Sequence, residues 1–264
     1  MLRFFRQIRQ RLLTDNKFSK YLLYAIGEIL LVVIGILLAL QINSMYESQE
    51  NRLKERGYLV QLTDELRSEI QYLKYLKAEF TSDSESLKRI TSQWQSGNSI
   101  VKDSSQYLID YSSVGLKNPW YTEPVTWTLL QQTGDLTLIQ NNALKNNLFV
   151  YYSTLKKGAD NYLQYPMEMI KQAREKMDLP FKNDNETFEI ILNYSIIYDD
   201  SVSVPSRYNE EVFTLIWQNR NNLLSVFIPV MGVSHAQVLL MEGLIFQGET
   251  LLKDLEAELA IKSE

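Results

Sequence analysis

A single carboxylate, Glu28, lies inside the most apolar stretch of the chain, residues 21–43. An ionisable group in such a stretch is energetically costly, which makes it a functional candidate. Three roles are open: the carboxyl is neutral or reaches toward the nearer membrane interface, it hydrogen-bonds a partner helix, or it relays protons in an energy-coupled complex. For the second role, Gly35 and Ala39 form a pair of small residues that lets two membrane helices approach closely.

Other residue types that catalyse reactions or bind metals are scarce. The chain has no cysteine and one histidine, His235, which excludes disulfides, thiolate catalysis and a His-rich metal site within one chain. The acidic cluster at residues 184–189 lacks the glycine and the spacing of a calcium loop. No phosphate-binding loop, HExxH or G-x-S-x-G motif is present. We therefore predict a non-enzymatic protein with no catalytic, cofactor-binding or metal-binding residues. A hydrolase built on a pair of buried acids is the remaining enzymatic alternative.

The apolar stretch predicts one transmembrane helix over residues 21–43. Of the 21 positions from Leu22 to Ile42, 14 are Leu, Ile or Val, and at about 1.5 Å per residue they span about 30 Å, the thickness of the hydrocarbon core. These residues favour insertion by about 4 to 8 kcal/mol, which exceeds the cost of about 3 kcal/mol for Glu28. The apolar region is longer than that of a cleaved signal peptide, so we expect it to be retained.

The first 20 residues are basic, whereas the rest of the chain is acidic. Because basic flanks stay in the cytoplasm, we predict a cytoplasmic N-terminus and a C-terminal domain on the other side of the membrane. Residues 2–13 follow an amphipathic pattern that predicts a short helix on the anionic inner leaflet, with topogenic charge and no ordered helix as the alternative. An acidic body argues against nucleic-acid binding. The predicted anionic-lipid contacts are Arg3, Arg6, Arg9, Arg11, Lys17 and Lys20.

Residues 44–95 predict a long helix that continues from the transmembrane helix. No proline interrupts this segment, and an apolar residue recurs at every seventh position from Leu59 to Trp94, which indicates a helix packed at a shallow angle against partner helices. Two of the intervening seam positions are acids, Glu69 and Asp83. In a parallel homodimer these acids would face their own copies, so an antiparallel bundle within one chain is favoured.

A long connection, residues 95–126, follows this helix and is rich in aromatic side chains. The aromatic side chains either clamp the connection onto the bundle or form a binding surface for a peptide or glycan, because rigid aromatic rings are good anchors. The residues of this candidate surface are Trp120, Tyr121 and Trp127.

Helix boundaries are indicated further along the chain. Gly134 is expected to end one helix, and Asn141 or Asn142 to begin the next one, which is interrupted at Pro166. The segment 188–197 fits either a short strand or a helical turn.

Two final helices are expected at about residues 206–228 and 234–261, because Pro229 and Gly232 lie between them. The last helix carries an apolar stripe and is expected to pack antiparallel against the long helix, with Gly248 allowing close approach.

Two blocks of the sequence carry distinctive motifs. The first, residues 4–43, has a basic N-terminus followed by the span AIGEI…LVVIGIL…ALQIN, and the second is TGDLTLIQNNAL at residues 133–144. Both blocks resemble an uncharacterised family of single-pass inner-membrane proteins of Gram-negative bacteria, whose turn-helix motif is TGxLxLIxNxxL. Family members more often continue with Asn and Trp where this span ends in Gln41-Ile42-Asn43-Ser44. The resemblance implies an inner-membrane protein with a periplasmic domain, and it implies no established enzymatic activity.

The expected fold is all-α, with a basic segment (1–20), a transmembrane helix (21–43), a long juxtamembrane helix (44–95) and an antiparallel helical bundle (96–264) that the C-terminal helix completes. The expected function is that of a membrane-anchored, non-enzymatic interaction or scaffold protein. Its expected partners are the lipid bilayer and another protein or a second copy of the chain, with no cofactor and no nucleic acid. The alternative is a sensor or an energy-coupling subunit of a membrane complex that uses Glu28.

Overall fold

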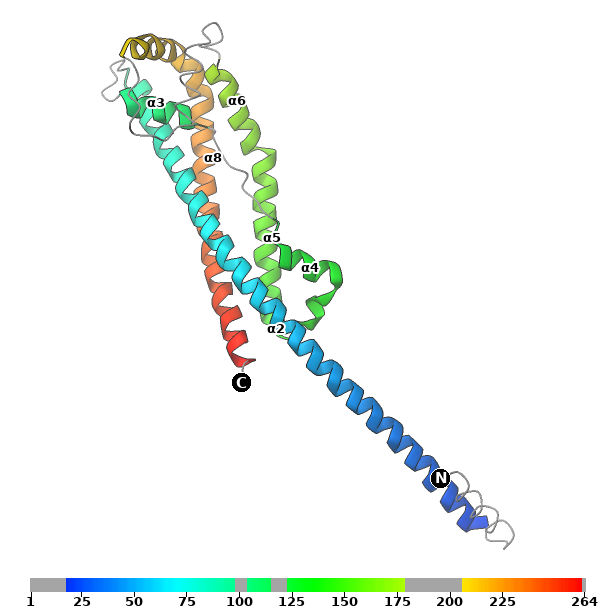
Figure 1. The fold of residues 1–264 in the computed structure, drawn as a ribbon. Coiled ribbons are helices and arrows are strands. Elements are labelled where there is room, and N and C mark those ends of the chain that lie inside the picture. Colours follow the sequence, from blue (N-terminus) through cyan, green and yellow to red (C-terminus); the bar gives the residue numbers. More distant parts are fainter. Residues whose placement is uncertain (1–17, 98–103, 115–122, 179–205, 263–264) are drawn as a thin grey trace. The chain divides into compact units, whose positions relative to one another are not determined.

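A computed structural model of the chain describes residues 18–97, 104–114, 123–178 and 206–262 (Figure 1). Within these ranges the chain is almost entirely helical and forms no strand, so the all-α prediction is confirmed. The segment 188–197 lies outside the described residues, and its predicted conformation stays open. The chain divides into two compact units, residues 1–57 and 58–264.

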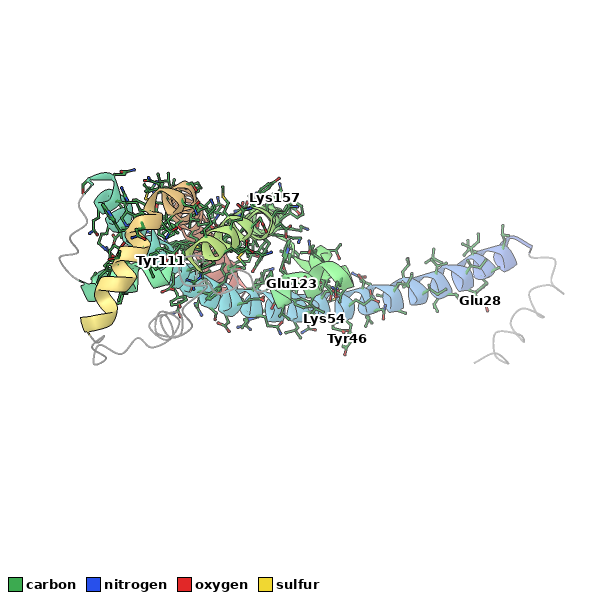
Figure 2. All side chains as sticks on the ribbon, turned by 90° about the horizontal axis from the view of Figure 1, so that it is seen from above. Glu28, Tyr46, Lys54, Tyr111, Glu123 and Lys157 are labelled. Atoms are coloured by element: carbon green, nitrogen blue, oxygen red, sulfur yellow. The ribbon has the colours of Figure 1, made fainter. Side chains whose placement is uncertain are left out.

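The described part of the first unit is the N-terminal part of helix α2, which covers Phe18–Gln95. This single helix contains both the predicted transmembrane helix and the predicted juxtamembrane helix, as the absence of proline led us to expect. None of the side chains from residue 22 to residue 54 is buried. Figure 2 shows Glu28 and Tyr46 projecting outward from this part of the helix.

The second unit is a bundle of long helices. Its long helices are the C-terminal part of α2, the consecutive helices α5 (Asn142–Gln164) and α6 (Pro166–Asp178), and α8 (Ser206–Ile261). The apolar heptad positions of α2 face the core, and none is more than 3% exposed, which confirms that this seam packs against partner helices. They are Leu59, Leu66, Leu73, Phe80, Leu87 and Trp94.

Helix α8 runs antiparallel to α2, as expected, because the residues that it pairs with descend in number as those of α2 ascend. The pairs are Arg67 with Glu256 at 2.7 Å, Lys74 with Glu249 at 2.7 Å and Lys77 with Glu242 at 2.8 Å. Each side chain in these pairs is more than a third exposed, so the pairs align the helices but add little stability. The opposite order of partners also makes α8 antiparallel to α5 and α6, where Asn147 bonds Asp254 and Lys176 bonds Ser225.

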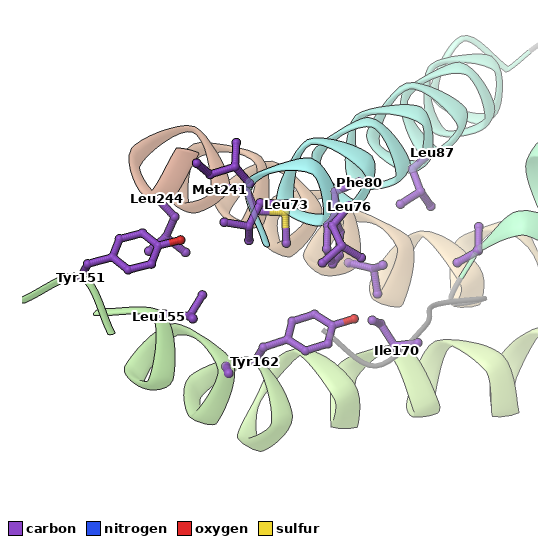
Figure 3. Packing of buried hydrophobic residues seen from close by; sticks show 14 of the residues in the cluster. Leu73, Leu76, Phe80, Leu87, Tyr151, Leu155, Tyr162, Ile170, Met241 and Leu244 are labelled. Carbon is purple, nitrogen blue, oxygen red and sulfur yellow. The ribbon is translucent and has the colours of Figure 1, made fainter. Parts of the chain in front are cut away.

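Gly248 brings α8 close to both neighbouring helices. A Cβ atom at this position would lie 3.1 Å from Cγ1 of Ile70 in α2 and 3.3 Å from the hydroxyl of Tyr151 in α5. The prediction that Gly248 allows close approach is therefore confirmed. Figure 3 shows Tyr151 and Tyr162 pointing from α5 into the core that Leu73, Leu76 and Leu244 help to fill.

The ends of the shorter helices follow their capping residues. Helix α4 (Val125–Thr133) ends at Gly134, whose φ of 78° is the left-handed conformation that glycine adopts at little cost. A short 3₁₀ helix, η1 (Asp135–Leu138), comes next. Helix α5 begins after Asn141, whose side chain accepts a hydrogen bond from the backbone N–H of Leu144 at 3.1 Å. Both predicted boundaries are confirmed, and Pro166 begins α6 after the expected interruption.

The expected break at Pro229 and Gly232 is wrong, because α8 continues from Ser206 to Ile261 with Pro229 inside it. A proline in a helix interior costs about 3 kcal/mol, since it removes a backbone hydrogen bond and its ring crowds the preceding turn. Phe227 and Val230 beside it are buried, and such side chains each contribute about 1.5 to 3 kcal/mol. Packing on both sides of the proline therefore offsets its local cost.

Candidate functional site

Glu28, Gly35 and Ala39 all lie on α2 in the first unit. Their separations are close to whole numbers of helical turns, so they lie along one face of the helix. All three residues are exposed, and a Cβ atom at Gly35 would meet no atom within 4 Å. This face is therefore one that lipid or another helix can reach.

The predicted lipid-binding side chains lie outside the part of the chain that the structure describes. This applies to Arg3, Arg6, Arg9, Arg11 and Lys17, and also to the side chain of Lys20 at the start of α2. Their contact with anionic lipid stays a prediction.

The candidate aromatic surface is only partly described, because Trp120 and Tyr121 lie outside the described residues. Trp127 is 6% exposed and stacks on Tyr152 with ring centroids 4.9 Å apart. Its ring is therefore a core element that clamps α4 onto the bundle, and it offers no open face to a peptide or glycan.

Helix α4 is also held at its N-terminus by a side chain from another helix. Pro124 precedes α4 and supplies no side-chain cap. Instead, the Glu65 carboxylate on α2 accepts hydrogen bonds from the backbone N–H groups of Val125 and Thr126. A carboxylate at a helix N-terminus satisfies free N–H groups and complements the helix dipole, so Glu65 joins α2 to the connection.

A polar layer crosses the core of the second unit close to this contact. Glu69, from the heptad seam of α2, interacts with Tyr151 and Tyr152 of α5. One oxygen of Glu69 and both tyrosine hydroxyls are buried and lack a hydrogen bond of regular geometry. Leu66 and Leu73 lie about one turn before and after Glu69 and are fully buried. Buried polar atoms without such a bond are rare in native proteins, which distinguishes this layer from the surrounding core.

The protonation of this layer is set mainly by burial. Burial raises the pKa of Glu69 to about 8, the Tyr151 hydroxyl offsets part of that rise, and the negative charge of Glu65 adds to it. Glu69 is therefore mostly uncharged at neutral pH, and its remaining exposure lets it exchange protons with water. Burial also raises the pKa of both tyrosines, so their hydroxyls stay protonated.

A groove of about 230 Å³ lies between α5 and α8 and includes Tyr151 in its lining. Two of its apolar side chains, Val150 and Phe246, are 56% and 73% exposed. Large exposed apolar side chains beside a groove are typical of contact surfaces. The full lining consists of Asn147, Val150, Tyr151, Phe246, Gln247, Thr250, Leu251 and Asp254.

The buried acid Asp110 has a structural role in the contact between α3 (Ser104–Ser113) and α2. Its side chain is 3% exposed and accepts hydrogen bonds from Ser86 at 3.0 Å, from Gln106 at 2.8 Å and from two nitrogens of Arg89 at 2.7 and 2.6 Å. These bonds fix α3 against the end of α2. Such a fully bonded carboxylate is poorly suited to act as a base.

The described residues offer no second acid in the groove and no cluster suited to a metal. Asp254 is the single acid of the groove lining, and it accepts a hydrogen bond from Asn147 at 3.1 Å. No group of three or more His, Cys, Asp or Glu side chains in the described ranges could hold a metal ion. The groove therefore holds a single acid, whereas the two acids Glu65 and Glu69 interact with each other on α2.

Comparison with protein-family models, curated proteins and solved structures finds no match to this chain. The family resemblance in the N-terminal block and in residues 133–144 accordingly stays a prediction. In the second block, Gly134 ends α4 and Asn141 caps α5. The glycine and the asparagine of this motif therefore have conformational roles at helix ends.

Sequence reasoning noted Glu69 as an acid in the heptad seam and missed its role in a buried polar layer. The available signal was its position between Leu66 and Leu73, since a seam residue between two buried leucines must itself approach the core. Its tyrosine partners lie far along the chain on α5, and no local spacing connects them to Glu69.

Proposed function

We propose that this chain is a membrane-anchored, non-enzymatic scaffold or interaction protein. The observation that carries the proposal is the exposed apolar part of α2. Two helices among the described residues, α2 and α8, are long and apolar enough to cross a membrane. In the most apolar window of α2 no residue is buried, whereas 33% of the corresponding window of α8 is buried. Because α8 supplies core residues to the bundle, a single crossing by α2 is the simplest topology.

The free-energy cost of exposing apolar side chains to water favours lipid around this part of α2. Its large apolar side chains, from Leu22 to Ile42, are 46–75% exposed. Apolar surface left in water is unfavourable by about 25 cal/mol per Å², and a bilayer removes that cost. The basic N-terminal segment favours a cytoplasmic N-terminus, with the bundle on the other side of the membrane. With the family resemblance of the N-terminal block, this supports a periplasmic bundle anchored in a Gram-negative inner membrane.

The bundle itself favours a binding role over catalysis. It has its own apolar core and an exposed groove with Val150 and Phe246 at its edge. The described residues offer no paired acids in that groove. A rigid helical surface held at a membrane is suited to holding a protein partner in place.

Membrane extraction and protease protection test the anchor and its orientation. The full chain, tagged at its C-terminus, should stay in the membrane pellet after an alkaline carbonate wash and dissolve in detergent. Protease added to spheroplasts should cleave the bundle and spare the N-terminal segment. A chain that appears in the soluble fraction, or an N-terminus cleaved from outside, would contradict the proposal.

Affinity purification of the full chain in mild detergent tests the scaffold role. A stoichiometric partner or a second copy should co-purify with it, and chemical cross-linking in intact cells should give the same species. Recovery of a monomer alone, without cross-linked species, would argue strongly against a scaffold.

Glu28 supports a second candidate, an energy-coupled or sensing subunit, because it shares one helix face with Gly35 and Ala39. Glu28→Gln keeps the size of the side chain and removes its charge. A scaffold should keep its partner after this change, apart from a modest loss of helix contact. Glu50→Gln, at an exposed ion pair outside the apolar stretch, is the matched control. Retained assembly with abolished cellular function in Glu28→Gln alone would favour the second candidate.

A further inference from the structure

Tyr151 belongs to two features of the bundle at once. It lines the groove between α5 and α8, and its hydroxyl interacts with the buried carboxyl of Glu69 on α2. A movement that separates Tyr151 from Glu69 must therefore also change the shape of the groove. We propose that Glu69 is a proton-operated latch that holds the groove closed when protonated and lets it widen when ionised.

The protonated carboxyl of Glu69 can form a hydrogen bond within the polar layer. Its O–H can donate a hydrogen bond, and the Tyr151 hydroxyl oxygen can accept one. The buried oxygen of Glu69 and the hydroxyls of Tyr151 and Tyr152 otherwise lack a hydrogen bond of regular geometry, so a small adjustment satisfies groups that are costly to leave unpaired. An uncharged carboxyl also avoids the cost of placing a charge beside buried leucines.

Burial and the negative charge of Glu65 oppose the ionised carboxyl, and the Tyr151 hydroxyl offsets only part of their effect. On α2, the negatively charged Glu65 is held at the N-terminus of α4 by its two backbone hydrogen bonds. On α5, Tyr151 and Tyr152 are uncharged, and on α8 Gly248, which packs against Tyr151, has no side chain. The charged neighbour of Gly248, Glu249, pairs with Lys74. No lysine or arginine among the described residues forms an ion pair with Glu69, so its charge is left uncompensated.

The close packing at Gly248 couples the unfavourable ionisation of Glu69 to the position of α8 relative to α5. A Cβ atom at Gly248 would lie 3.3 Å from the Tyr151 hydroxyl and 3.1 Å from Ile70, so Tyr151 packs closely against α8 in the closed bundle. Ionised Glu69 is only partly exposed in the closed bundle, and a local separation of α5 from its neighbouring helices would bring it more water. Val150 and Phe246 lie on the two sides of the groove and should move apart.

The distance across the groove tests the latch. Because the chain contains no cysteine, Val150→Cys and Phe246→Cys provide a unique pair of sites for nitroxide labels in the full chain, reconstituted in lipid nanodiscs. The distance distribution, measured by pulsed electron paramagnetic resonance, should be short and narrow about two pH units below 8. It should become longer and broader about two units above 8, with a midpoint near the value of about 8 for Glu69.

Three variants in the labelled background test whether Glu69 causes the change. Glu69→Gln, which imitates the protonated form, should stay short and narrow at both pH values. Asp64→Asn, one turn away at an exposed pair with Arg67, should keep the transition of the parent chain. Tyr151→Phe should move the midpoint to higher pH, because the Tyr151 hydroxyl lowers the pKa of Glu69; this readout remains if Glu69→Gln fails to fold. A distance that is independent of pH in the parent chain, or a transition that persists in Glu69→Gln, would overturn the proposal.

Discussion

The two acids in the heptad seam of α2 both meet tyrosine side chains of α5. Asp83 is 7% exposed and contributes, after burial, to raising the pKa of Tyr162 to about 12. Glu69 interacts with Tyr151 in the same way, about two heptads earlier. Each acid therefore marks a polar layer within an apolar seam. Such layers can fix the alignment of helices, because a shifted alignment would bury a carboxyl against leucine.

The stability of the bundle should depend on pH through Glu69. An exposed glutamate in the unfolded chain ionises near 4.5, whereas Glu69 in the folded chain ionises near 8. The folded state therefore binds the extra proton between these values, so stability falls as pH rises from about 4.5 and the loss is complete above about 8. A shift of this size corresponds to at most about 5 kcal/mol.

Urea unfolding measured at several pH values checks this expectation. In Glu69→Gln the fall in unfolding free energy between pH 5 and pH 9 should be smaller than in the parent chain by several kcal/mol. Equal pH profiles for the two chains would show that Glu69 does not titrate differently on folding.

Gly248 should tolerate no large side chain. Gly248→Leu places atoms where Ile70 and Tyr151 already lie within 3.1–3.3 Å of a Cβ, and overpacking of this kind costs about 1 to 3 kcal/mol. Gly243→Leu is the matched control on the same helix, because its Cβ would meet no atom within 4 Å. That control should be neutral or stabilising by up to about 1 kcal/mol, since leucine is the better helix former. Similar midpoints of urea unfolding for the two variants would contradict the close approach at Gly248.

At the scale of elements, Pro229 shows how tertiary packing overrides a local signal. Pro229→Ala should restore a backbone hydrogen bond inside α8 and raise the unfolding free energy by about 1 to 3 kcal/mol. Thermal unfolding followed by circular dichroism checks the direction of the change. A lower midpoint for Pro229→Ala would mean that the core around Phe227 and Val230 requires the bend that a proline imposes.

The helices that sequence reasoning predicted well are those with signals close together in the chain. The heptad repeat from Leu59 to Trp94 predicted a buried seam, and Gly134 and Asn141 predicted helix ends, because a left-handed glycine and an asparagine cap act within a few residues. Pro229 led to the prediction of a helix break that the structure does not have. Whether the free-energy cost of a proline inside a helix is offset depends on the burial of neighbouring side chains against distant segments of the chain. The Glu69 layer needs α2 beside α5, and the groove needs α5 beside α8; no local pattern specifies either arrangement.

At the scale of the whole chain, the two units differ in how far they bury their own apolar side chains. The second unit has a core with fully buried leucines, such as Leu62, Leu130 and Leu223, so it can shield its own apolar residues. The apolar side chains from Leu22 to Ile42 in the first unit are exposed, so they need lipid or another protein. We therefore expect the second unit, but not the first, to be stable in water without lipid.

A fragment of residues 44–264 should therefore be soluble and folded without detergent. It loses the apolar stretch and the basic segment and keeps the entire second unit, together with residues 44–57, which are mostly polar. After cell breakage it should stay in the supernatant, show a helical circular dichroism spectrum and unfold cooperatively in urea. The full chain should require detergent under the same conditions.

A shorter fragment, residues 44–205, provides the control for this argument. It lacks α8, which supplies Leu223, Leu244 and Leu255 to the core, so the apolar faces of α2 and α5 would lie open to water. This fragment should aggregate or unfold without a cooperative transition, because large apolar patches drive association. If residues 44–264 also aggregated, or residues 44–205 folded equally well, α8 would not be the element that completes a self-sufficient core.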